Sequence, residues 1–242
     1  MNQHTPITEA PEALVERLAI AGRAAQAALA RLSDSDKAEG LRRAAQALRD
    51  DEAAILAANA LDIADGEANG LSGAMLDRLK LDAARLSAIA DAVDQVAALP
   101  DPVGEVISTS ERPNGLVLTR VRVPIGLIGI IYESRPNVTV DAAVLCLRSG
   151  NAALLRGGSE AVHSNRALMA ALQRGLAAGG LPAEAVQLVP VQDRAVVGAM
   201  LTAAGLIDMI VPRGGKSLVA RVQSDARVPV LAHLDGICHT YL

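Results

Sequence analysis

Apolar residues recur at helical spacing through the first hundred residues of the chain. A first helix is expected from Pro11, because proline is tolerated at a helix start. Its apolar face is formed by Leu14, Leu18, Ala21 and Ala25. Asp36 with Glu39 resembles a capping box that opens a second helix, and two more helices are predicted over residues 52–67 and 82–98. We expect this alanine-rich part to form a packing layer or a dimer surface.

The pattern becomes extended after residue 103. Between residues 104 and 123, β-branched side chains flank the turn Pro113-Asn114-Gly115. Asn-Gly is favoured in tight hairpin turns, where the backbone needs a positive φ. This stretch therefore predicts a β-hairpin.

Beyond Pro124, short apolar runs alternate with amphipathic segments. The apolar runs predict buried strands over residues 125–131, 152–155, 186–189, 207–211 and 228–232. The segments between them predict helices over residues 137–149, 160–178, 194–203 and 216–224. Strands that alternate with helices indicate an α/β fold with a doubly wound parallel sheet. Ligands of such sheets bind beyond the carboxyl ends of the strands, so the loops there are the first candidates for a site.

Composition narrows the classes of partner. Lys and Arg number 23 against 27 Asp and Glu, which argues against nucleic acid as a partner because phosphate neutralisation needs a basic surface. Two cysteines are too few for a disulfide framework and favour a reducing compartment. No apolar run reaches the length of a membrane span, and the first residues lack the apolar centre of a signal peptide. We expect a cytoplasmic protein that does not contact a membrane.

Two of the loops that follow strands are basic turns with paired glycines. They are Arg156-Gly157-Gly158-Ser159-Glu160 and Arg213-Gly214-Gly215-Lys216. Glycine lets the backbone approach a ligand, and the helix start that follows attracts anions. Each pair could simply close a tight turn, but two such loops at one sheet edge favour phosphate binding. Neither is a Walker loop, and the chain has no GxGxxG motif.

Cys238 follows the last predicted strand and stands beside His239, so it is a candidate nucleophile. An inert loop thiol fits the same residues equally well. A metal site is a weaker alternative, because the spacing from His233 to Cys238 and His239 is not a zinc signature. Cys146 lies among apolar residues and is expected in the core.

Four stretches together resemble the gamma-glutamyl phosphate reductase branch of the aldehyde dehydrogenase superfamily. They are VPIGLIGIIYESRPNVTVDAA (123–143), LRSGNAALLRGGSEA (147–161), IVPRGG (210–215) and DGICHTYL (235–242). The resemblance covers nearly the whole chain. It implies a helical segment over residues 1–103, a hairpin of the oligomerisation region over 104–123, a variant Rossmann NADP-binding domain over 124–232, and the start of a catalytic domain over 233–242.

The resemblance also implies roles for single residues. The family's basic residue after the second sheet strand falls on Arg156, and the turn Gly157-Gly158-Ser159-Glu160 would lie at the adenosine ribose and its 2′-phosphate. Gly214 and Gly215 would face the pyrophosphate. Glu160 would repel a 2′-phosphate unless its side chain turns away, so the preference for NADPH rests on the resemblance.

On the substrate side, the superfamily's oxyanion-hole asparagine falls on Asn137, with Arg135 as a competitor for that position. Arg135, Glu133 and Ser134 are expected to bind the substrate. In this family NADPH reduces L-glutamyl 5-phosphate to L-glutamate 5-semialdehyde through a cysteine thioester, as part of proline biosynthesis.

The family's nucleophile follows the GICHxYL motif and is therefore expected beyond Leu242. Cys238, inside that motif, stays an alternative. The resemblance further implies a homo-oligomer for the whole protein and a possible contact with glutamate 5-kinase. A catalytically incomplete nucleotide-binding module is the alternative function.

Overall fold

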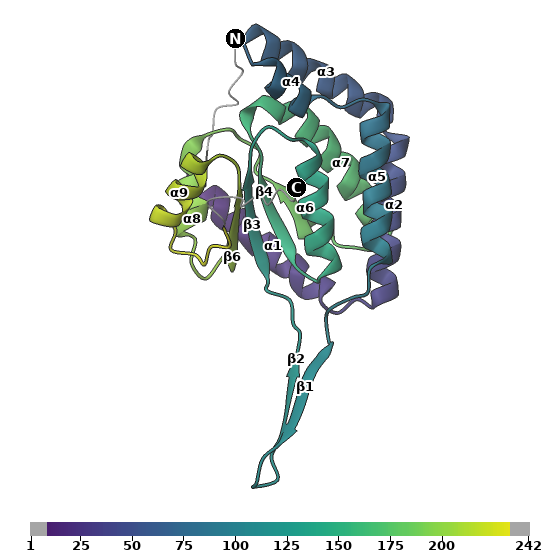
Figure 1. Ribbon diagram of the computed structural model, residues 1–242, viewed down its shortest axis with the longest axis vertical. Coiled ribbons are helices and arrows are strands. Elements are labelled where there is room, and N and C mark those ends of the chain that lie inside the picture. The colour runs from purple at the N-terminus through teal and green to yellow at the C-terminus, as the bar shows by residue number, and fades with distance from the viewer. Residues whose placement is uncertain (1–8, 233–242) are drawn as a thin grey trace, which may run out of the picture.

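Four parallel strands form the central sheet of the computed structural model, which describes residues 9–232 (Figure 1). In chain order they are β3 (Leu127–Tyr132), β4 (Ala152–Arg156), β5 (Val186–Leu188) and β6 (Met209–Arg213). Their order across the sheet is β5-β4-β3-β6, so winding proceeds from β3 in one direction and then resumes on its other side. The predicted doubly wound parallel sheet is confirmed.

The predicted last strand over residues 228–232 is wrong. Only one bridge forms there, between Ile210 and Val230. The Ile210 N–H donates to the Pro229 carbonyl at 2.8 Å, and the Leu231 N–H donates to the Ile210 carbonyl at 2.9 Å. Pro229 has no N–H of its own, which limits how far a ladder can extend along this segment.

Helices cover both faces of the sheet because the side chains of β3 alternate between two apolar cores. Ile128 and Ile130 pack with α6 and α7, whereas Leu127 and Ile131 pack with α1, α8 and α9. Figure 1 shows these helices on opposite sides of the strands. Their bounds are α1 (Pro11–Leu29), α6 (Asn137–Arg148), α7 (Val162–Ala178), α8 (Arg194–Thr202) and α9 (Lys216–Asp225). Two short 3₁₀ turns are η1 (Ser159–Ala161) and η2 (Ala183–Ala185).

A second helical layer packs on α7. It consists of α2 (Asp34–Asp50), α3 (Glu52–Ala68), α4 (Gly73–Leu79) and α5 (Ala83–Ala98). The backbones of α2 and α7 come so close that a Cβ added at Gly175 would lie 2.5 Å from the Ala44 Cα.

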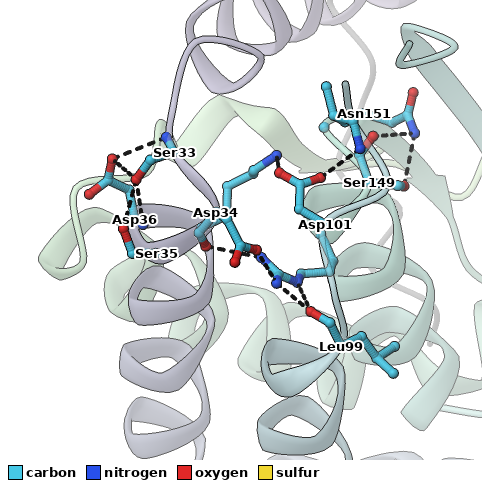
Figure 2. A network of polar contacts seen from close by, with 12 residues as sticks. Ser33, Asp34, Ser35, Asp36, Leu99, Asp101, Ser149 and Asn151 are labelled. Carbon is cyan, nitrogen blue, oxygen red and sulfur yellow. Dashed lines mark hydrogen bonds and ion pairs between the residues drawn. The ribbon is translucent and has the colours of Figure 1, made fainter. Parts of the chain in front are cut away.

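The predicted capping box of α2, Asp36 with Glu39, was wrong by one turn. Ser33 and Asp36 form it, because Ser33 is the residue just outside the helix and Asp36 bonds back to its N–H (Figure 2).

The predicted hairpin is confirmed as β1 (Val106–Glu111) and β2 (Val117–Val121), which pair antiparallel. Gly115 in its turn has φ 81°. Every residue of both strands is exposed. The chain passes from β2 into the amino end of β3, so the hairpin projects away from the sheet edge that carries the candidate loops (Figure 1).

Two buried cations, Lys37 and Arg148, lie where the hairpin joins the body. We call these cations, their partners and a nearby buried asparagine the root network: Asp34, Lys37, Leu99, Asp101, Arg148 and Asn151. Lys37 is 1% exposed and forms an ion pair with Asp101, while Arg148 contacts the Asp34 carboxylate and the Leu99 carbonyl (Figure 2). Asn151 Oδ1 accepts the backbone N–H groups of residues 125 and 126 at 2.6 and 2.9 Å. The network ties the amino end of α2 to both chain segments that lead to the hairpin.

Candidate active site

The loops after β3 and β6 lie side by side at the carboxyl edge of the sheet. The chain leaves these neighbouring strands toward opposite faces, which makes this the position where such sheets bind ligands. Glu133 bridges the two loops, because its Oε2 accepts the Gly215 N–H at 2.9 Å. Gly215 is the residue that caps α9. The Glu133 carboxylate therefore sits where a helix start attracts an anion.

The loop after β4 joins the same arrangement through Glu160. Its Oε1 accepts the Ser134 N–H at 2.7 Å and the Ser134 hydroxyl at 2.6 Å. Ser134 has φ 49°, a left-handed conformation that is costly for a residue with a side chain. The structure thus brings all three predicted loops together. Glu133 and Ser134, predicted to face the substrate, bond the two loops predicted to face the cofactor.

Close neighbours favour glycine at two positions in these loops. A Cβ at Gly214 would lie 2.5 Å from Glu133 Oε2, and one at Gly157 would collide with the Asn165 amide. Gly158 is buried beside the Glu160 carboxylate, and Ser159 is exposed at the start of η1. The absence of side chains lets the backbone of both loops approach these neighbours closely.

Arg156 ends β4 and is half-buried. Its guanidinium donates to the carbonyls of Gly157 at 2.9 Å and Gln192 at 3.0 Å. Burial is the main cause that lowers its pKa; the Glu160 charge opposes this effect and the Arg194 charge adds to it. The charge of Arg194, the exposed first residue of α8, therefore acts on Arg156, together with the opposite charges of Glu160 and Asp193.

A cavity of about 430 Å³ opens on the other side of the loop after β3, between α4, α5 and α6. Asn137, the first residue of α6, faces it together with Arg135 and Asp141. The Asn137 amide donates to Asp141 Oδ2 at 2.8 Å. Burial raises the pKa of the Asp141 carboxyl, and this hydrogen bond lowers it in part. The predicted residues thus divide between the loops at the sheet edge and the cavity.

The sequence reasoning missed the cavity wall formed by α4 and the turn after it. This wall contributes Asp77, Arg78, Lys80, Leu81 and, from α5, Arg85. The signal in the sequence was a concentration of charges at residues 77–85 beside Ser72, which accepts the Met75 N–H and caps α4.

Of the two cysteines, Cys146 lies in α6 and is 7% exposed. Burial raises its thiol pKa to about 12, so it is the core residue that was predicted and not a nucleophile. Cys238, His233 and His239 lie outside the described residues. Within residues 9–232, no helix is long and apolar enough to cross a bilayer.

The parallel sheet and the loops at its carboxyl edge define the class of protein. The model of the aldehyde dehydrogenase family matches residues 2–237, nearly the whole chain. The chain belongs to the aldehyde dehydrogenase family.

Within that family, the chain is similar to gamma-glutamyl phosphate reductases. The enzyme of Novosphingobium aromaticivorans is 72% identical over 240 residues, which cover 99% of this chain and 56% of that protein. That of Sphingopyxis alaskensis is 67% identical over 230 residues, covering 95% and 54%. The resemblance to this branch is confirmed.

Two solved structures of gamma-glutamyl phosphate reductases share the fold. The Thermotoga maritima structure has a TM-score of 0.87 and 39% identity, and it covers 90% of this chain and 52% of that chain. The Saccharomyces cerevisiae structure has a TM-score of 0.82 and 34% identity, covering 92% and 56%. The chain spans about half the length of the relatives it matches.

Proposed function

We propose that this chain supplies the cofactor-binding part of an NADPH-dependent reductase that converts L-glutamyl 5-phosphate into L-glutamate 5-semialdehyde and phosphate in proline biosynthesis. The observation that carries the proposal is the meeting of three loops beside a cavity that holds Asn137. A cavity of about 430 Å³ falls in the ordinary range for small-molecule sites. The similarity to gamma-glutamyl phosphate reductases supports this particular reaction.

The loop residues fit a nicotinamide dinucleotide at the sheet edge. Gly157 and Gly214 let the backbones of their loops pack closely against neighbouring side chains at the sheet edge, and the start of α9 favours a phosphate. In this proposal a cofactor phosphate replaces the Glu133 carboxylate at the Gly215 N–H. When bound, the cofactor supplies the hydride.

The adenosine end of the cofactor is proposed to lie at Arg156. Arg194 is exposed beside it and offers a cation to a 2′-phosphate. Glu160 is held by two hydrogen bonds from Ser134, so its carboxylate is already engaged on the side of the β3 loop. This arrangement supports NADPH over NADH.

At the reacting end, Asn137 is the proposed oxyanion donor. One N–H of its amide binds Asp141, which leaves the second N–H for the substrate oxygen. The nucleophilic cysteine is proposed to follow residue 242, with Cys238 as the alternative. Cytoplasmic location follows from the same proposal, since a free thiol needs a reducing compartment.

Thermal unfolding of the chain with each cofactor tests the proposal. NADPH should raise the midpoint of unfolding more than NADH does, because only binding to the folded state stabilises it. Arg194→Gln should remove most of the difference between the two cofactors. Arg31→Gln is the matched control, because Arg31 is exposed and its side chain has no bond to any described residue. Protection by neither cofactor would contradict the proposal.

The hairpin supports a homo-oligomer as the state of the whole protein. Its exposed apolar side chains belong to Val106, Ile107, Leu116, Val117, Leu118 and Val121. An exposed strand pair with apolar residues is suited to association with a further chain. Sedimentation of the whole protein with and without residues 104–123 tests this, and an unchanged mass would contradict it. Contact with glutamate 5-kinase stays a prediction.

A catalytically incomplete nucleotide-binding module is the second candidate function, because Cys146, the one cysteine among residues 9–232, is buried and its pKa is raised. Cofactor protection without reductase activity of the chain alone would favour this module. Measurable activity that Cys238→Ala abolishes would instead assign the nucleophile to Cys238.

A further inference from the structure

The turn between α4 and α5 is held rigidly against the body of the protein. Asn59, a residue of α3 that is 2% exposed, donates to the Leu79 carbonyl at 2.9 Å and accepts the Leu81 N–H at 2.8 Å. These are the peptide groups on either side of Lys80. The same amide donates to Ser164 in α7 at 2.9 Å. The wall of the cavity is therefore fixed to the helix that packs under the sheet.

Arg85 braces the turn from the other side. Its guanidinium donates to the carbonyls of Asp77 and Lys80 at 2.5 and 2.9 Å and to the Asp77 carboxylate at 2.7 Å. The charge of Arg85 is thus matched by Asp77. Together the two braces set the backbone from which Arg78 and Lys80 extend.

Three cations of the cavity remain without a partner in residues 9–232. The side chains of Arg78, Lys80 and Arg135 form no hydrogen bond or ion pair with any described residue, although all three line the cavity. Asp141 is the opposing acid, and its Oδ2 accepts the Asn137 amide, whereas its Oδ1 accepts no hydrogen bond from the described residues. A rigid wall with an excess of positive charge, facing one half-buried carboxylate, is complementary to a small anionic molecule that also carries an ammonium group.

We propose that Arg78 and Lys80 bind the α-carboxylate of an amino-acid substrate and that Asp141 accepts its α-ammonium. The other end of the substrate then points toward Arg135 and Asn137. This inference rests on the proposed function, because it names the residues that select the substrate of that reaction. It assigns substrate selection to the turn after α4, a segment far in sequence from the loops of the sheet edge.

Calorimetric titration of the chain with L-glutamate tests the proposal. L-Glutamate should bind, and Arg78→Gln combined with Lys80→Gln should weaken it at least about tenfold, since two charge-assisted contacts are lost. The matched control is Arg31→Gln combined with Arg227→Gln, which removes two exposed cations outside the cavity and should leave the affinity unchanged. All these positions are exposed, so the variants are expected to fold.

Two analogues separate the two contacts. Glutarate lacks the ammonium, and Asp141→Asn should narrow the preference for L-glutamate over glutarate. 4-Aminobutanoate lacks the α-carboxylate and should bind weakly, with little change in the Arg78 and Lys80 double variant.

Equal affinity of the double variant and the unchanged chain, or no binding of L-glutamate at all, would overturn the inference. Protection by NADPH is measured in parallel and should survive in the double variant. Glutamate binding that depends on Arg78 and Lys80, without protection by NADPH, would overturn the proposed cofactor and leave the cavity assignment standing.

Discussion

The root network and the cavity both contain cationic side chains, but those of the root network are paired, whereas Arg78 and Lys80 in the cavity are open. In the root network, Lys37 and Arg148 are buried and each is closed by an acid or a carbonyl. In the cavity, Arg78 and Lys80 extend from a braced backbone and have no partner in the described part of the chain. A buried cation with its partners holds the fold, whereas an open cation on a rigid wall is available to a ligand.

A substitution in the root network should have the largest effect on the free energy of unfolding. Asp101→Ala leaves Lys37 buried without its carboxylate and also removes the acceptor of the Val103 N–H. We expect the free energy of unfolding to fall by about 3–5 kcal/mol. Denaturant titration measures the loss. The control is Glu105→Ala, which removes an exposed ion pair with Arg122 and should cost no more than about 1 kcal/mol. Similar losses in the two variants would contradict the difference expected between the buried ion pair and the exposed one.

Loss of the Asn59 hydrogen bonds that hold the cavity wall should have the second-largest effect on stability. Asn59→Ala leaves the Leu79 carbonyl and the Leu81 N–H without their partner, which should cost about 1–3 kcal/mol in the free energy of unfolding. The affinity for L-glutamate should fall as well, although Asn59 does not line the cavity. Calorimetry of the folded variant checks this. A stability loss with unchanged affinity would show that the wall does not need the brace.

Tyr132 provides a smaller effect with a pH signature. Its hydroxyl lies 2.6 Å from Thr139 Oγ1, and burial raises its pKa to about 12. Tyr132→Phe should cost about 1 kcal/mol at neutral pH. The raised pKa means that the contribution is complete below pH of about 10 and declines as the pH rises toward 12, because the unfolded phenol ionises first. The gap between the two proteins should narrow over that range in denaturant titrations. A constant gap would contradict the shift.

The smallest effect on stability is expected where binding should change most. Arg78→Gln combined with Lys80→Gln should alter the free energy of unfolding by no more than about 0.5 kcal/mol, because neither side chain contacts a described residue. Denaturant titration of the variant used for calorimetry checks this. A loss above about 1 kcal/mol would mean that these two cations stabilise the fold, as those of the root network do.

Much of the sheet was predictable because its strands are continuous apolar runs with glycine-rich loops behind them. The parallel order of the strands, and the gathering of the loops that follow them at one sheet edge, followed from the alternation of strands and helices. The segment at 228–232 misled the prediction, because Val228, Val230 and Leu231 are typical of a strand although Pro229 cannot donate to one.

The cavity was not predicted, although charges are concentrated at residues 77–85, and the reason is visible in α4. This helix is seven residues long and buries only Leu79, so it leaves almost no periodic pattern. The turn after α4 is held in place by the Asn59 amide of α3, which contacts residues 20 and 22 positions later in the chain. Such a contact has no local signature. The same holds for the engagement of Glu133 and Ser134 with neighbouring loops, since their residue types alone fitted a substrate equally well.

The strand order has a consequence for synthesis on the ribosome. β3 is the first sheet strand to emerge and ends up in the middle, paired with β4 on one side and with β6 on the other. All six of its residues are buried in the finished sheet, and the backbone groups along its second edge are unpaired until β6 has been made. At roughly 5–20 residues per second, that wait lasts on the order of several seconds. During this time the nascent chain presents an apolar strand with one open edge, a feature that favours association between chains.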